Sequence, residues 1–65
     1  MNKLRELRHQ KKMKQSEVAK IVGISQQAYS YFELGLSKPS LDTAKRIADF
    51  YKKPIEEIFF SKLDN

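Results

Sequence analysis

The sequence contains no cysteine and no tryptophan, one histidine, two glycines and two prolines among 65 residues. Without cysteine, the chain has neither a disulfide nor a thiolate metal site, and His9 alone does not make a metal site. No apolar run approaches the roughly 20 residues that a helix needs to cross a membrane. The first residues also lack the apolar segment of a signal peptide. We therefore expect a cytoplasmic protein with no membrane partner, no cofactor, no metal and no small-molecule ligand.

The residues needed for catalysis are also scarce. No Ser–His–acid set can be assembled around His9, which lies in a basic stretch. Glu56 and Glu57 are adjacent, so their carboxylates point in different directions on a helix. Two isolated glycines do not form a phosphate-binding Gly-rich loop. We expect that the chain is not an enzyme.

Positive charge is what the chain has in excess. Thirteen Lys and Arg residues face eight Asp and Glu residues, which gives a net charge of +5 and a pI near 9.6. A basic small domain favours polyanionic partners, chiefly nucleic acid. The cations crowd the first third of the sequence, at Lys3, Arg5, Arg8, Lys11, Lys12, Lys14 and Lys20. For each of them, an ordinary solvated helix face is an equally good interpretation.

Helix signals divide the chain into five segments, which predicts an all-α fold in a single domain over residues 1–65. We expect helices over residues 2–12, 15–22, 26–34 and 41–51, and a fifth with Pro54 as its first residue. Asn2, Ser25 and Ser40 are suitable N-caps, and Gly23 and Gly35 are suitable stops. The residues with helical apolar spacing form the expected core: Leu4, Leu7, Met13, Val18, Val22, Tyr29, Phe32, Leu41, Ala44, Ile47, Ala48, Tyr51, Ile55, Ile58 and Phe59.

The second and third helices have the spacing of a helix-turn-helix. Val18 and Val22 lie one turn apart, Gly23 ends the first helix, and Ser25 caps the second. Ala19 is small enough to let the two helices cross closely. In a helix-turn-helix the second helix enters the DNA major groove. A plain helical hairpin is the alternative.

On these and other residues the chain resembles the Cro/repressor (XRE-like) helix-turn-helix family of bacterial and phage regulators. The matching pieces between Met13 and Ile58 are Gln15-x-Glu17-Val18-Ala19, Gly23-Ile24-Ser25, Ser30-x-Phe32-Glu33-x-Gly35, Pro39-Ser40-Leu41 and Ile55-Glu56-Glu57-Ile58, with Arg8 upstream. The resemblance implies a five-helix, lambda-repressor-like DNA-binding domain. It further implies a transcriptional repressor that binds double-stranded DNA as a homodimer on a palindromic operator.

The resemblance also suggests roles for individual residues. Base reading falls to Gln26, Gln27, Ser30 and Tyr31, since a Gln amide can pair with adenine in the major groove. The DNA backbone would be held by Lys14, Gln15, Ser25, Ser37 and Lys38. Arg8 and Glu33 are expected to form a partly buried ion pair. Phe50, Phe60 and Leu63 are candidates for the dimer interface, although they could instead complete the small core.

The chain departs from the family pattern at four positions, which are Lys12, Lys14, Tyr31 and Leu34. Family members often carry Gly where Lys12 stands, which leaves open whether Lys12 adopts a left-handed conformation. Lys14 replaces a capping Ser or Thr, Tyr31 replaces a common Arg, Lys or Gln, and Leu34 replaces a common Asn. A second hypothesis is therefore a protein-interaction module, antitoxin-like or anti-repressor, which would use Tyr31, Phe50 and Phe60 as its contact surface.

Overall fold

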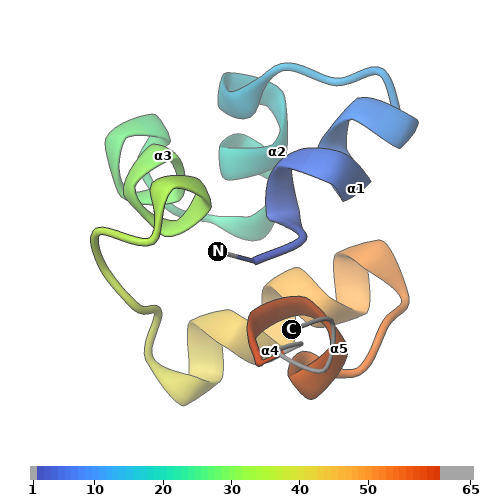
Figure 1. Cartoon of the computed structure of the whole chain (residues 1–65). Helices are drawn as coiled ribbons and strands as arrows, with labels where there is room; N and C mark the ends of the chain where they lie inside the picture. Colours follow the sequence, from blue (N-terminus) through green and yellow to red (C-terminus); the bar gives the residue numbers. More distant parts are fainter. Residues whose placement is uncertain (1, 61–65) are drawn as a thin grey trace.

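A computed structural model of the chain describes residues 2–60, and that part of the chain folds into five helices. They are α1 (Leu4–Gln10), α2 (Gln15–Val22), α3 (Gln26–Leu34), α4 (Leu41–Tyr51) and α5 (Ile55–Phe59). In Figure 1, α1, α2 and α3 form one half of the molecule, and α4 and α5 form the other. The predicted bounds of α2, α3 and α4 are confirmed. No helix between residues 2 and 60 is long and apolar enough to cross a bilayer.

Both predicted bounds of α1, residues 2 and 12, and the predicted start of α5 are wrong by one or two residues. The first helix begins at Leu4, not at residue 2, and it ends at Gln10. Asn2 still performs the capping chemistry, because its Oδ1 accepts a hydrogen bond from Leu4 N at 3.0 Å. Pro54 is extended, with ψ near 151°, so it occupies the N-cap position and α5 begins at Ile55. Proline fixes φ but leaves ψ free, and residue type alone therefore does not separate these two positions.

The first four helices end in the same way, on a residue in or beside a left-handed turn. The left-handed residues are Lys12, Gly23, Gly35 and Lys52, with φ values of 57°, 79°, 76° and 57°. In each case, the amide of the next residue donates to a carbonyl five positions back, as Ile24 N does to Ala19 O at 2.9 Å. This is the Schellman arrangement. Lys12 therefore adopts the left-handed conformation in which relatives often place glycine.

The core lies between the two halves of the molecule and follows the predicted apolar stripes closely. Tyr29, Leu4, Ile47, Ile58 and Val18 are its largest fully buried side chains. The small residue Ala19 is buried where α2 packs against the rest of the core. Leu41 was expected in the core but is 72% exposed. It is the first residue of α4 and borders a hollow that Ile55, Phe59 and Phe60 also line.

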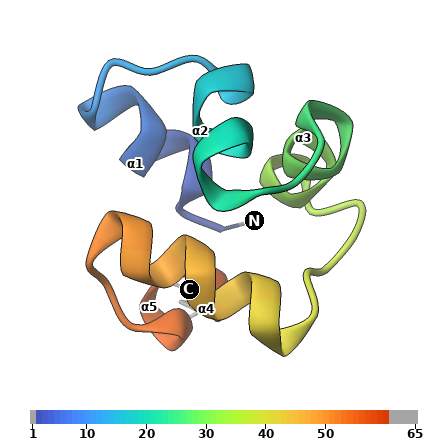
Figure 2. The same cartoon turned by 180° about the vertical axis from the view of Figure 1, so that it is seen from behind.

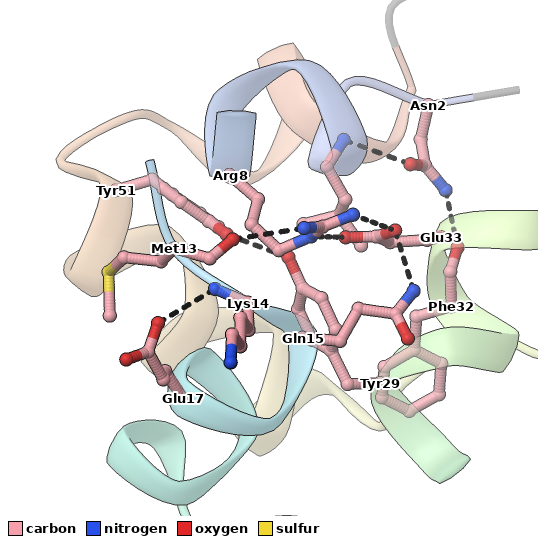
Figure 3. Close-up of polar contacts among 11 residues, drawn as sticks. Asn2, Arg8, Met13, Lys14, Gln15, Glu17, Tyr29, Phe32, Glu33 and Tyr51 are labelled. Atoms are coloured by element: carbon pink, nitrogen blue, oxygen red, sulfur yellow. Dashed lines mark hydrogen bonds and ion pairs between the residues drawn. The ribbon is translucent and has the colours of Figure 1, made fainter. Parts of the chain in front are cut away.

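An ion pair joins α3 to α1. Arg8 Nε donates to Glu33 Oε2 at 2.6 Å, and Arg8 Nη2 donates to Glu33 Oε1 at 3.2 Å. The same guanidinium donates through Nη1 to Met13 O, and Gln15 Nε2 donates to Glu33 Oε1 at 3.0 Å (Figure 3). Glu33 is 2% exposed and Arg8 12% exposed. One carboxylate thus fixes α3 to both α1 and the first residue of α2.

The pKa values in this network follow from burial and from the ion pair. Burial alone would raise the pKa of the Glu33 carboxyl, but hydrogen bonds from Arg8 and Gln15 and the charge of Arg8 outweigh burial and lower it. The hydrogen bond to Glu33 raises the pKa of Arg8. Both groups therefore stay charged at neutral pH.

Two further contacts seat α3 in the fold. The hydroxyls of Tyr29 on α3 and Tyr51 on α4 share a hydrogen bond of 2.7 Å inside the core. Burial raises the pKa of both hydroxyls, so both keep their protons. At the other end of the helix, Asn2 Nδ2 donates to Phe32 O at 2.7 Å. Polar contacts consequently anchor α3 to α4 and to the N-terminal segment as well as to α1.

Replacing Glu33 by Gln should lower the free energy of unfolding by about 3 kcal/mol at neutral pH, since it leaves the Arg8 charge buried without a counter-charge. Urea unfolding followed by helical circular dichroism measures this. Because the folded pKa of Glu33 lies below its ordinary value of 4.5, its contribution is complete above about pH 4.5 and is lost as pH falls through the folded pKa. Glu33→Gln should remove that part of the acid sensitivity.

The control for this experiment is the double variant Arg8→Met with Glu33→Met. It removes both charges and keeps apolar volume, so it should be less destabilised than the sum of the two single replacements. A Glu33→Gln protein as stable as the original chain at neutral pH would contradict a role for the ion pair in holding α3.

Replacing Lys12 by Gly should raise the free energy of unfolding by about 0.5–1 kcal/mol. The left-handed conformation costs a residue with a Cβ about 1–2 kcal/mol, which exceeds the entropic cost of about 0.5–1 kcal/mol that glycine adds. Lys52→Gly has the same φ and should give the same gain. Lys12→Ala keeps the Cβ and should give none. An equal gain from alanine would assign the effect to the lost charge.

Candidate nucleic-acid interface

The helix-turn-helix pair places α3 at one edge of the molecule. Both views show α3 beside α2 and on the outside of the fold (Figures 1 and 2). Tyr29 and Phe32 turn one side of α3 into the core. Gln27 and Tyr31 are exposed on the opposite side, Gln26 is exposed as the first residue of the helix, and Ser30 is half-buried. The four residues predicted to read bases therefore include three that solvent, or a groove of DNA, can reach.

The exposed side of α3 carries no formal charge. Glu33 is the one ionisable acid or base on this helix other than its tyrosines, and it is buried and paired with Arg8. Amides and hydroxyls remain on the outside, together with the exposed side chain of Leu34 at the end of the helix. Such amides and hydroxyls donate to and accept from base edges in the major groove, where each base pair presents its own pattern.

Gln27 and Tyr31 are one helical turn apart and are bonded to each other. Gln27 Nε2 donates to Tyr31 Oη at 3.0 Å, on an exposed surface. Neither residue type nor spacing predicted this pairing, because both side chains can adopt several rotamers. The contact removes one hydrogen of the Gln27 amide from the set that is free to bind DNA.

Three of the residues predicted to hold the DNA backbone surround the start of α2 and α3. Lys14 is exposed, and its backbone amide donates to Glu17 Oε1 at 2.8 Å, which caps α2 without a Ser or Thr. Gln15 is half-buried and uses one amide hydrogen on Glu33. Ser25 Oγ accepts from Ala28 N at 3.0 Å, so it caps α3. Gln15 and Ser25 each keep one hydrogen for a phosphate.

Ser37 and Lys38, the other two backbone candidates, lie in the loop after α3. Both are exposed, and both line a hollow of about 410 Å³ between this loop, the start of α4 and α5. We call this hollow the groove. Ser37 and Lys38 therefore lie between α3 and the groove.

Arg5 and His9 were not predicted to belong to the site. With Gln15, Ser30 and Leu34 they line a second hollow, of about 610 Å³, between α1 and α3. A cation next to the reading side of α3 is well placed to meet a phosphate. The signals available in the sequence were their spacing of four residues, which puts them on one face of α1, and the place of Arg5 among the clustered cations of the first third.

Two cations that flank α1 face elsewhere. Lys11 Nζ lies 5.2 Å from the centre of the Phe50 ring, in a cation–π contact. Lys3 is half-buried and lines a small hollow with Lys53 and Glu57. The cations in and beside α1 are thus divided between α3 and the residues of α4 and α5 and the turn that joins them.

The predicted dimer residues do not form one surface. Phe50 is half-buried beneath Lys11 and packs edge-on against Tyr51. Phe60 lies at the other end of α4, where it lines the 410 Å³ groove with Leu41, Ile55 and Phe59. Leu63 lies outside the described residues. Among the residues that line the groove, Leu41 and Phe60 are the exposed large apolar side chains.

Comparisons with known proteins agree with this architecture. The helix-turn-helix family pattern matches residues 4–58. The CTXphi cryptic phage transcriptional repressor RstR of Vibrio cholerae is 37% identical over 57 residues, which are 88% of this chain and 51% of RstR. An uncharacterized HTH-type transcriptional regulator of Methanocaldococcus jannaschii is 38% identical over 63 residues, which are 97% of this chain and 96% of that protein.

A third relative, an HTH-type transcriptional regulator of Archaeoglobus fulgidus, is 37% identical over 57 residues, 88% of this chain and 80% of that protein. The chain spans about half the length of RstR but nearly all of the M. jannaschii regulator. The matched region contains all of α1 to α4 and most of α5. The chain belongs to the XRE-type helix-turn-helix family of DNA-binding transcriptional regulators.

Proposed function

We propose that the protein is a sequence-specific transcriptional repressor that binds a palindromic operator as a homodimer in the cytoplasm. The observation that carries this is the α3 surface: exposed amides and hydroxyls, with the only carboxylate of the helix buried against Arg8. Arg5, Lys14 and Lys38 supply the positive charge around it. Phosphate contacts would position the domain, and α3 would read the bases.

A homodimer follows from the size of the reading surface. One nine-residue helix contacts only a few base pairs, and specific sites in this class pair two half-sites about 34 Å apart on one DNA face. We assign the dimer contact to the 410 Å³ groove, whose exposed large apolar side chains are Leu41 and Phe60. Ser37 and Lys38, which the proposal places on the DNA backbone, line the same groove, so the dimer contact would lie next to the DNA.

A protein-interaction module of the same fold is less well supported. The surface assigned to it, Tyr31, Phe50 and Phe60, is not continuous. Phe50 lies on α4 and is covered by Lys11, whereas Tyr31 lies on α3 and is bonded to Gln27 of the same helix.

Selection from a randomised duplex library at near-physiological salt tests the proposal. An enriched sequence with two inverted half-sites would support it and would identify the operator. Uniform weak binding that disappears as salt rises would show phosphate attraction alone and would overturn it.

Gln27→Ala and Lys38→Ala should have different effects on DNA binding. Removing the Gln27 amide should cost about 1–3 kcal/mol on the selected operator and little on random duplex, because a base contact is lost. Lys38→Ala should weaken binding to both duplexes alike and lower the salt slope by about one, because a phosphate contact is lost. Fluorescence anisotropy across a salt series measures both. Equal losses on both duplexes for Gln27→Ala would contradict base reading.

Leu41→Gln and Phe60→Gln should weaken binding to a two-half-site operator by roughly 30-fold each. A two-fold interface loses the side chain twice, at about 1 kcal/mol per partly buried apolar group. Binding to a single half-site should not change.

Ile21→Gln is the matched control, since Ile21 is 58% exposed and Phe60 is 56% exposed, but Ile21 lies on α2 away from the groove. An Ile21→Gln effect as large as that of Phe60→Gln would contradict the assignment of the interface to this groove.

A further inference from the structure

The hydrogen bond between Gln27 and Tyr31 lies inside the surface that the proposed function assigns to base reading. Both residues are exposed, with Tyr31 at 42%, so packing does not force them together. Gln27 is in the first turn of α3, and Tyr31 is one turn later on the same side. The Nε2–Oη distance of 3.0 Å is that of a good hydrogen bond.

The bond changes which groups Gln27 offers to a base. A free amide has one acceptor oxygen and two N–H donors. With one hydrogen on Tyr31, it keeps its oxygen and a single donor. Adenine presents one donor, N6, and one acceptor, N7, which this reduced set matches. Guanine presents two acceptors, N7 and O6, and would need both amide hydrogens.

The bond also holds the Gln27 side chain in place before DNA arrives. A free Gln side chain loses substantial rotamer entropy when it is fixed, and prior fixation reduces that cost on binding. Gln26, the adjacent amide, has no side-chain hydrogen bond within residues 2–60. The two neighbouring glutamines therefore differ in freedom, although their sequence context is nearly the same.

We propose that Tyr31 is a specificity-determining residue, which positions the Gln27 amide so that it prefers adenine to guanine. This rests on the proposed function, since it assigns a role within the same DNA-reading surface. Tyr31 acts through Gln27 and needs no base contact of its own. The variant that isolates this role is Tyr31→Phe, which removes only the hydroxyl and should leave the free energy of unfolding unchanged.

The pairing can first be measured on the free protein by NMR of the side-chain amides. Tyr31→Phe should shift the two Nε2 hydrogens of Gln27 and speed the solvent exchange of one of them. The Gln26 side-chain resonances serve as the internal reference and should stay in place. Unchanged Gln27 resonances would overturn the proposal without any DNA measurement.

The DNA test is a double-mutant cycle on the selected operator. The base pair that loses its preference in Gln27→Ala is set to A·T or G·C, and both duplexes are titrated with the original chain, Tyr31→Phe, Gln27→Ala and the double variant. Tyr31→Phe should reduce the preference for adenine over guanine by about 3- to 10-fold, the value of one net hydrogen bond. In the Gln27→Ala background, Tyr31→Phe should have no further effect on that preference.

The remaining outcomes overturn the inference in different ways. Equal weakening on all duplexes by Tyr31→Phe, with or without Gln27, would make Tyr31 a phosphate contact. Coupling of Tyr31 to Gln26→Ala as strong as to Gln27→Ala would show a general loss of α3 geometry. No sequence preference in the original chain would overturn the proposed function itself, and the NMR result would still report whether the side-chain pair exists.

Discussion

The carboxylate of Glu33 determines how α3 sits. It is nearly inaccessible to solvent, it accepts two hydrogen bonds from Arg8 and a third from Gln15, and these partners come from α1 and the start of α2. Removing any one of these partners would leave a buried charge incompletely paired, which costs free energy. The network therefore holds α1, α3 and the start of α2 in fixed positions relative to one another. The same burial removes the only negative charge of α3 from the surface that would face DNA. The position of α3 and the absence of negative charge from its exposed side therefore both depend on Glu33.

Sharp helix ends make this arrangement possible in a chain of 65 residues. Each of the first four helices ends in a left-handed turn, which is closed by a hydrogen bond from a backbone amide to the carbonyl five residues earlier. The connections between the helices are consequently short. Two of the turns use glycine and two use lysine. Lys12 follows the helix that carries Arg8, and Arg8 Nη1 also bonds Met13 O just beyond this turn. The strained turn and the ion pair therefore support the same junction between α1 and α2.

Residue patterns that act locally predicted most of this fold. Gly23 and Gly35 as stops, Ser25 and Ser40 as N-caps, and the apolar spacing of Val18, Val22, Ile47 and Ala48 set α2, α3 and α4 at their observed bounds. Features that depend on rotamers or on neighbouring elements were not predictable in this way. The Gln27–Tyr31 bond, the exposure of Leu41, the cover of Lys11 on Phe50 and the approach of Arg5 and His9 to α3 all arise from packing.

The distribution of charge separates two tasks that a small DNA-binding domain must combine. Cations at Arg5, Lys14 and Lys38 stand around α3 but not on its outer side, so attraction to phosphate does not require any group that reads bases. The outer side, left neutral, contributes little non-specific affinity. Sequence preference must then come from the orientation of a few amides and hydroxyls. If this surface reads bases as proposed, the exposed hydrogen bond between Gln27 and Tyr31 would affect specificity more than stability.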